Sequence, residues 1–279
     1  MRRIGGHVSM AGSLLNAVKK TEEIGGNCMQ IFAGSPRLWF RKPFPEDQVN
    51  DFLRETEKQN IFPTFIHALY LVNLASTNKD ILEKSINSLI IDMQNGASIK
   101  SAGVIVHIGS HLGIGFDSVK EQIITVIKNI LSNTNNCDLI LENDAGQNGK
   151  IGSPEELSYL METINSNRLK MCLDSAHLFE SGVDIRKPAV IEEFSKQLIK
   201  LGLLDKLVCI HLNDSATVLD SHRDMHSNIG EGEIGLNGLK NLINHSSFNS
   251  QPLILEVPGE KHEGPDQINI DKVKKLAEQ

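Results

Sequence analysis

Short runs of apolar residues recur along the chain and alternate with amphipathic stretches. The apolar runs are residues 3–9, 28–33, 63–68, 103–109, 137–143, 169–175, 206–214 and 252–257. Between the third and fourth runs, apolar side chains fall at helical spacing over residues 80–94, as expected of a helix with one buried face. The pattern therefore predicts strands that alternate with helices.

The number and order of these units favour a closed barrel over an open sheet. After the fifth run, Ser153 is placed as an N-cap, Pro154 as the first helical residue and Glu156 as the partner in a capping box. No long linker, low-complexity tract or change in composition divides the 279 residues. We therefore predict one α/β domain over residues 1–279, a (β/α)8 TIM barrel.

The residues that end the predicted strands are candidates for a metal site. In a TIM barrel the active site lies at the carboxyl ends of the strands, because the loops that follow them converge around the barrel mouth. Zinc-ligand residue types end six of the runs: His67, His107, Glu142, Asp174, His211 and Glu256. Carboxylates crowded into one mouth cannot all stay ionised without cations, so ligands from six strands predict more than one metal ion.

Two loops supply further ligand types. His177 follows Asp174 by three residues, and Asp224 and His226 are separated by one residue. In an extended loop, side chains two positions apart point the same way, so Asp224 and His226 can bind one ion together. Histidine and carboxylate ligands without thiolates fit catalytic zinc, or manganese and iron, better than structural zinc.

The composition argues against a disulfide-rich, membrane-spanning or exported protein. The cysteines, Cys28, Cys137, Cys172 and Cys209, show no CxxC spacing and are expected to be reduced, buried thiols of an intracellular protein. No apolar run approaches the roughly 20 residues of a membrane span, and the amino terminus has no apolar segment of an export signal. The formal net charge of −7, taken alone, argues against a nucleic-acid binder.

Eight segments, in order and over essentially the whole chain, resemble the signature segments of a known family. They are "GGHVSMAG", "HALYLVNLAS", "VHIGSHLG", "LENDAGQ", "LDSAHLF", "IHLNDS", "RDMHSNIGEGEIG" and "PLILEV". The chain is thereby similar to endonuclease IV, the zinc-dependent apurinic/apyrimidinic endonuclease of base excision repair. Individually these patterns are short, but eight colinear ones with every ligand type in place make coincidence improbable.

The resemblance implies a ligand set of three zinc ions, with manganese or iron as alternatives at one position. His67, His107 and Glu142 would hold the first ion, and Glu142 would bridge to the second. Asp174, His211 and Glu256 would complete the second site, and His177, Asp224 and His226 would hold the third. Glu142 and Glu256 are the predicted catalytic residues. Three Zn²⁺ would also offset most of the negative charge of the chain.

The resemblance further implies hydrolysis of the phosphodiester bond 5′ to an abasic site in duplex DNA, leaving a 3′-hydroxyl and a 5′-deoxyribose phosphate. Arg37, Tyr70 and Leu71 would enter the base stack while the baseless sugar turns into the metal pocket. Arg41, Lys42 and Arg223 are further basic residues in predicted mouth loops. A monomer is expected, in the cytoplasm or nucleoid or in whichever compartment holds the DNA under repair.

Three residues near the site are left open. His7 and His111 lie near strand ends, and either a supporting role for the ligands or a phosphate contact fits them. Asp144 stands where the family commonly has a threonine, so an extra carboxylate is expected beside Glu142.

Two rival functions remain. A metal-dependent sugar isomerase or epimerase shares the barrel and the ligand types, but would need only one or two ions and an acid/base residue such as lysine. A non-catalytic DNA-damage binding protein that keeps zinc for structure would be expected to lack the bridging carboxylate, whereas Glu142 is present.

Overall fold

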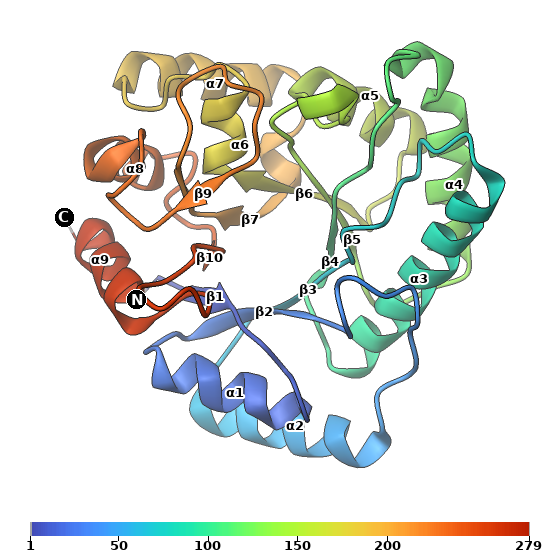
Figure 1. The fold of residues 1–279 in the computed structure, drawn as a ribbon, viewed down its shortest axis with the longest axis horizontal. Helices are drawn as coiled ribbons and strands as arrows, with labels where there is room; N and C mark the ends of the chain where they lie inside the picture. The colour runs from blue at the N-terminus through green and yellow to red at the C-terminus, as the bar shows by residue number, and fades with distance from the viewer. Residues whose placement is uncertain (1, 279) are drawn as a thin grey trace.

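The strands close into a parallel barrel in the computed structural model, which describes residues 2–278 (Figure 1). The barrel strands are β1 (Ile4–His7), β2 (Cys28–Phe32), β3 (Thr64–His67), β4 (Gly103–Val106), β5 (Leu139–Glu142), β6 (Leu169–Asp174), β7 (Leu207–His211) and β10 (Leu253–Leu255). Within the described residues each strand pairs with its neighbours in chain order, and β10 returns to β1. The prediction of a TIM barrel is confirmed.

Helices surround the barrel between successive strands (Figure 1). They are α1 (Leu14–Glu23), α2 (Glu46–Gln59), α3 (Lys79–Ser98), α4 (Lys120–Ser132), α5 (Pro154–Ile164), α6 (Ser175–Glu180), α7 (Pro188–Lys200), α8 (Gly235–Asn244) and α9 (Gln267–Ala277), with short 3-10 turns η1 (Phe116–Ser118), η2 (Gln147–Gly149) and η3 (Leu204–Lys206). The predicted capping box of α5 is present, with Ser153 and Glu156 each accepting from the other's backbone N–H.

A two-stranded hairpin follows β7 and departs from the predicted pattern. The run at residues 206–214 is broken after His211, and β8 (Asp214–Ser215) pairs antiparallel with β9 (His226–Ser227). Asp214 is fully buried, and its carboxylate accepts hydrogen bonds from the backbone N–H groups of Gly230, Gly232, Ile234 and Gly235. The hairpin and Asp214 thus fix the loop that carries Asp224 and His226.

The barrel interior is filled by one residue from each of seven strands. This layer consists of Cys28, Phe65, Ile105, Ile140, Cys172, Cys209 and Ile254. A larger apolar cluster fills the space between the barrel and its helices. The cysteines are free and buried, as predicted, and three of them belong to the interior layer.

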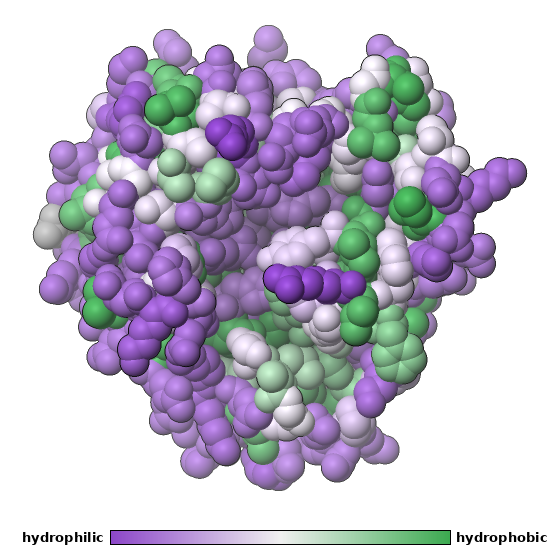
Figure 2. All heavy atoms as spheres, in the orientation of Figure 1, coloured by the Kyte–Doolittle hydropathy of each residue, from purple (hydrophilic) through white to green (hydrophobic). Residues whose placement is uncertain are grey.

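The face drawn in Figure 1 is hollowed at its centre, over the barrel (Figure 2). Hydrophilic residues lie in the hollow, and hydrophobic residues gather along part of its rim. Between residues 2 and 278, no helix combines the length and the apolar character needed to cross a membrane.

Candidate metal centre

The candidate ligands form the layer directly above the apolar interior layer. Side chains two positions apart on a strand point to the same side, so the residue two positions after an inward apolar residue also faces the barrel axis. Two residues after the interior layer come Gln30, His67, His107, Glu142, Asp174, His211 and Glu256. The strand geometry therefore directs every predicted strand-end ligand into the same mouth, together with Gln30, which the sequence pattern had not singled out.

Glu142 lies at the centre of this layer and is fully buried at the end of β5. Its Oε2 is 3.3 Å from His67 Nε2 and 3.5 Å from His107 Nε2. Its Oε1 is 2.8 Å from His211 Nδ1 and 3.6 Å from His177 Nδ1. One carboxylate thus faces imidazoles on both sides, which is the arrangement expected of a ligand that bridges two cations.

The possible ligand atoms fall into overlapping groups. Within each group these atoms lie within 4.8 Å of one another. Three of the groups lie in the ligand layer: His67, His107 and Glu142; Glu142, Asp174, His211 and Glu256; and Asp174, His177 and His226. A further group joins His211 to Cys172 and Cys209 of the interior layer. The first two groups coincide with the first two predicted zinc sites. The third group contains two of the predicted ligands, His177 and His226, but has Asp174 where the prediction placed Asp224. Asp174 therefore belongs to both the second and the third group.

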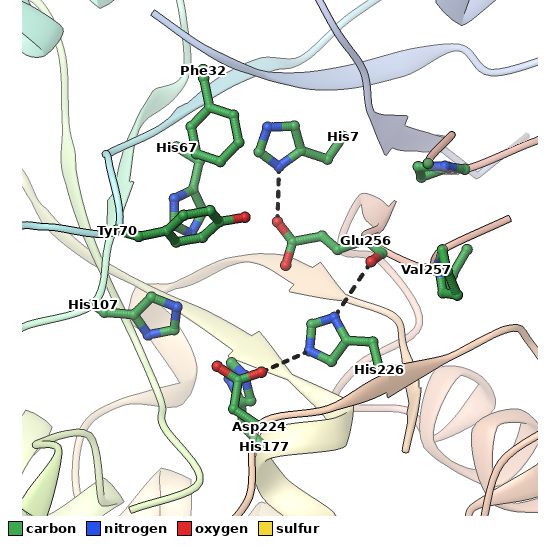
Figure 3. A pocket seen from close by; sticks show the side chains of 13 residues that line it. His7, Phe32, His67, Tyr70, His107, His177, Asp224, His226, Glu256 and Val257 are labelled. Atoms are coloured by element: carbon green, nitrogen blue, oxygen red, sulfur yellow. Dashed lines mark hydrogen bonds and ion pairs between the residues drawn. The ribbon is translucent and has the colours of Figure 1, made fainter. Parts of the chain in front are cut away.

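Asp224 reaches the third group from the loop between β8 and β9 (Figure 3). Its Oδ1 is 3.2 Å from His177 Nε2 and 3.5 Å from His226 Nε2. Both ring nitrogens are buried and make no hydrogen bond within residues 2–278. One carboxylate oxygen and two ring nitrogens thus face one another and can bind a common cation, and this donor set suits zinc.

Backbone carbonyls fix the orientation of three histidine rings. The Nδ1 atoms of His67, His177 and His226 lie 2.7, 3.0 and 3.4 Å from the carbonyl oxygens of Ala68, Asn143 and Glu256. A carbonyl oxygen only accepts, so the neutral ring carries its proton on Nδ1. The unprotonated Nε2 of each ring is then directed at the carboxylates, where it can bind a metal.

In His211 the proton is placed on Nε2, and not on Nδ1, by a hydrogen bond to Gln30. His211 Nε2 donates to Gln30 Oε1 at 2.8 Å, which leaves Nδ1 facing Glu142 and Glu256. The amide nitrogen of Gln30 in turn donates to Glu256 Oε1 at 2.6 Å. Gln30 is fully buried, and a polar side chain inside the apolar run of residues 28–33 was the signal that could have identified it.

The surrounding imidazoles hold the carboxylates ionised. Burial would raise the pKa of Glu142, but His107 and His211 more than offset this and lower it well below its ordinary value. Burial likewise opposes ionisation of Glu256 and Asp224, yet His211 and His177 respectively lower their pKa values. These groups therefore stay negative throughout the physiological range.

The carboxylates act on the imidazoles in return. Burial would lower the pKa of His177, but Asp174 and Asp224 raise it well above its ordinary value. The pKa of His211 is also raised well above its ordinary value, against burial, by Cys172, Glu256 and Glu142. The cluster therefore requires positive charge at its centre, from protons on the rings or from metal cations that compete with them.

The centre opens into a cavity of about 500 Å³ that is rimmed by aromatic residues (Figure 3). Tyr70 stands at this rim, 66% exposed, with its ring 5.2 Å from that of Phe32 and 6.1 Å from that of His67. Leu71 is also exposed, and Arg37 is exposed in the loop after β2.

Arg41 does not face the mouth as its place in a predicted mouth loop suggested. Its side chain is buried and pairs with Asp92 of α3 at 3.1 Å, while its guanidinium donates to the carbonyls of Ser35, Leu38 and Phe40. Arg41 is therefore not one of the basic groups at the mouth, because its side chain holds the loop from within.

The structure shows the contacts of His7, His111 and Asp144, whose roles the sequence left open. His7 Nδ1 lies 3.0 Å from Glu256 Oε1, so it supports that carboxylate (Figure 3). His111 Nδ1 accepts from the N–H groups of Gly113 and Gly115, which makes it an organiser of its own loop. Asp144 is buried beside His107.

Comparison with known proteins agrees with this geometry. A family model described as "xylose isomerase-like TIM barrel" matches residues 18–278. Proteins named probable endonuclease 4 are similar over nearly their full length: one from Haloquadratum walsbyi is 37% identical, with 99% of this chain and 98% of that protein covered, and one from Halothermothrix orenii is 38% identical, with 95% and 96% covered.

Solved structures give the same result. The crystal structure of endonuclease IV from Thermus thermophilus superposes with a TM-score of 0.86 at 31% identity, covering 99% of each chain. A D-tagatose 3-epimerase-like protein superposes with a TM-score of 0.71 at 19% identity, covering 99% of this chain and 96% of its own, which shows the shared barrel alone. With its sequence matched from end to end and its strand ends converging on one histidine and carboxylate cluster, the chain belongs to the endonuclease IV family.

Proposed function

We propose that the protein hydrolyses the phosphodiester bond 5′ to an abasic site in duplex DNA, leaving a 3′-hydroxyl and a 5′-deoxyribose phosphate. The observation that carries the proposal is the continuous set of histidines and carboxylates around Glu142, open to a rimmed cavity. The similarity to proteins named endonuclease 4 supports the same reaction class.

The residues present fit three zinc ions. His67, His107 and Glu142 would hold the first; Glu142, Asp174, His211 and Glu256 the second; and His177, Asp224 and His226 the third, with Asp174 close by. Zinc bound there would supply Lewis-acid stabilisation of the phosphate charge and a nucleophile at neutral pH.

The chain's own groups keep the catalytic carboxylates in place. Glu142 is enclosed between His67 and His211, while Glu256 accepts a hydrogen bond from Gln30 and lies 3.0 Å from His7. Because every one of these contacts is made by a residue of the barrel strands, the carboxylates are held on rigid elements. A site of this kind loses little free energy to reorganisation when the substrate binds.

The rim is suited to testing whether a nucleotide lacks its base. An enzyme for abasic sites has no base edge to read, and must instead detect a sugar that leaves the helix easily. Although much of Tyr70 is exposed, it also lines the cavity, and desolvation there, together with Glu256, Asp224 and Glu142, raises the pKa of Tyr70 to about 12, so its phenol stays neutral. A neutral exposed ring above the centre can stack in the vacated space, with Leu71 and Arg37 beside it.

The reaction is tested with a duplex oligonucleotide that carries one tetrahydrofuran abasic analogue. This analogue cannot undergo β-elimination, so a nick in it is hydrolytic. The zinc-loaded protein, without added Mg²⁺, should nick on the 5′ side and leave an end that a DNA polymerase extends. The same duplex without the lesion is the control.

Failure to nick this duplex by protein that holds its zinc would contradict the proposal. Turnover of a ketose or aldose by the same preparation would favour the epimerase-type rival. Tight binding of the abasic duplex without cleavage would instead favour a non-catalytic damage-binding protein.

A further inference from the structure

Asp144 contacts a candidate metal ligand from the side away from the metal centre. It follows Glu142 by two residues and is buried, with a side-chain exposure of 1%. Its Oδ2 lies 3.1 Å from His107 Nδ1, within ion-pair distance although the two atoms are not aligned as a hydrogen bond, while Nε2 of the same ring lies 3.5 Å from Glu142 Oε2. The imidazole of His107 is thus placed between two carboxylates, one at each nitrogen.

His107 differs in this respect from the other candidate histidines. The rings of His67, His177 and His226 have a backbone carbonyl at Nδ1, whereas the ring of His107 has a carboxylate there. A carboxylate at the outer nitrogen of a metal-binding histidine fixes the ring and increases its strength as a ligand.

Asp144 is itself held from two further directions. Its Oδ1 accepts from the N–H of Gly146 at 3.1 Å, and its Oδ2 lies 3.2 Å from Lys150 Nζ. The Lys150 ammonium is also 3.5 Å from Asp224 Oδ2, so it connects this carboxylate with the third ligand group. The carboxylate therefore cannot turn away from His107 without losing other contacts.

We propose that Asp144 is a positioning residue for the metal centre: it fixes His107 with the proton on Nδ1 and Nε2 free for the first cation. The inference rests on the proposed metal ligation by His107. It assigns to a side chain of this protein the task that backbone carbonyls perform for the neighbouring histidines.

Asp144→Asn is the informative substitution because it preserves shape and removes one acceptor. If the amide oxygen still accepts the hydrogen bond from the Gly146 N–H, the amide N–H₂ faces His107 Nδ1 and favours the tautomer protonated on Nε2. If the amide turns over, its N–H₂ opposes the Gly146 N–H instead. The first arrangement weakens the presentation of Nε2 to a metal ion, and the second keeps the tautomer only at the cost of the Gly146 hydrogen bond that holds the side chain.

The first test measures zinc affinity by competition with a chromophoric chelator. Asp144→Asn should release one of the ions at a chelator concentration about 10 to 100 times lower than the parent does. The matched control is Asp138→Asn, which makes the same change just before β5 begins, at the far end of the strand. An unchanged zinc affinity in Asp144→Asn would overturn the proposal.

The second test is read on the parent protein and uses a variant only to assign the signals. In ¹⁵N spectra of the zinc-saturated parent, His107, assigned by the signals lost in His107→Gln, should show a protonated Nδ1 and a coordinated Nε2. Coordination through Nδ1, or an unprotonated Nδ1, would overturn the proposal even if Asp144→Asn were unstable. A parent that binds zinc in this way but does not cleave abasic DNA would contradict the proposed function and leave the role of Asp144 intact.

Discussion

At the scale of single residues, Glu142 is a fully buried carboxylate in contact with several histidines. Its buried carboxylate is within 3.6 Å of ring nitrogens from four different histidines. Each oxygen faces two of them, so removing one negative charge would leave the imidazoles without their shared counter-charge. The residue therefore contributes through its charge and its two equivalent oxygens, and an isosteric amide cannot replace either property.

Glu142→Gln is expected to lower cleavage of the abasic duplex by orders of magnitude and to reduce the zinc content. Binding of the abasic duplex should persist, because the rim residues are untouched. Single-turnover cleavage, elemental analysis and equilibrium binding on one oligonucleotide measure the three quantities. Glu155→Gln, on the exposed surface of α5, is the matched control. Parent-like cleavage by Glu142→Gln would exclude the bridging role.

At the scale of elements, the barrel strands were the most predictable part of the chain. Their apolar runs end in ligand residues because the interior layer and the ligand layer are two positions apart on each strand. The loops were less predictable. Arg41 pairs with Asp92, and no local pattern shows that a residue of the β2–α2 loop meets the middle of α3. Gln30 was missed for a related reason, since its partners lie on β1, β7 and the end of β10.

The buried pair of Arg41 and Asp92 also explains how a loop without helix or strand can present Arg37. The guanidinium of Arg41 donates to carbonyls on both sides of Arg37, and so fixes the turn from which Arg37 projects. The loop after the adjacent strand, between β3 and α3, presents Tyr70 and Leu71. Two neighbouring loops therefore form the proposed wedge.

If these loops act as a wedge, Tyr70→Ala and Arg37→Ala should each weaken binding of abasic duplex by about 1 to 3 kcal/mol, through lost stacking and lost contacts. Zinc content should stay at the parent value, because neither side chain is a ligand. Fluorescence anisotropy with an abasic duplex measures the binding. Tyr159→Ala is the control, since Tyr159 packs against Phe116 on the helical outside of the barrel. Binding as tight as the parent's would exclude the wedge.

At the scale of the whole molecule, the candidate ligands come from the ends of six barrel strands, β3 to β7 and β10, and from the loops that follow them. Ions held by ligands from β3 to the end of β10 would connect segments that are distant in sequence, so metal binding should stabilise the entire fold. In zinc-free protein, protons on the histidines would supply the positive charge instead. The stability of the two forms should then differ in its dependence on pH.

The direction in which the stability of the zinc-free protein changes with pH follows from the raised pKa values of His177 and His211. A histidine whose pKa is higher in the folded than in the unfolded protein stabilises the fold fully below its unfolded pKa, about 6.5, and this stabilisation is lost as the pH rises through the folded value. Zinc needs deprotonated rings and takes over the positive charge above that range. Thermal unfolding should therefore show a gap in Tm between zinc-loaded and zinc-free protein that widens as the pH is raised from 6.5.

Elemental analysis of the loaded form should find close to three zinc ions per chain. His226→Ala should lose mainly one of them, because the remaining side chains leave the third group short of a ligand. The Tm gap of this variant should be smaller than that of the parent at each pH, and His245→Ala, which removes a histidine paired with Glu192 outside the centre, should keep the parent gap. A Tm gap that stays constant with pH would mean that protons on these histidines do not stand in for the metal, and a zinc content near one would contradict the three-ion cluster itself.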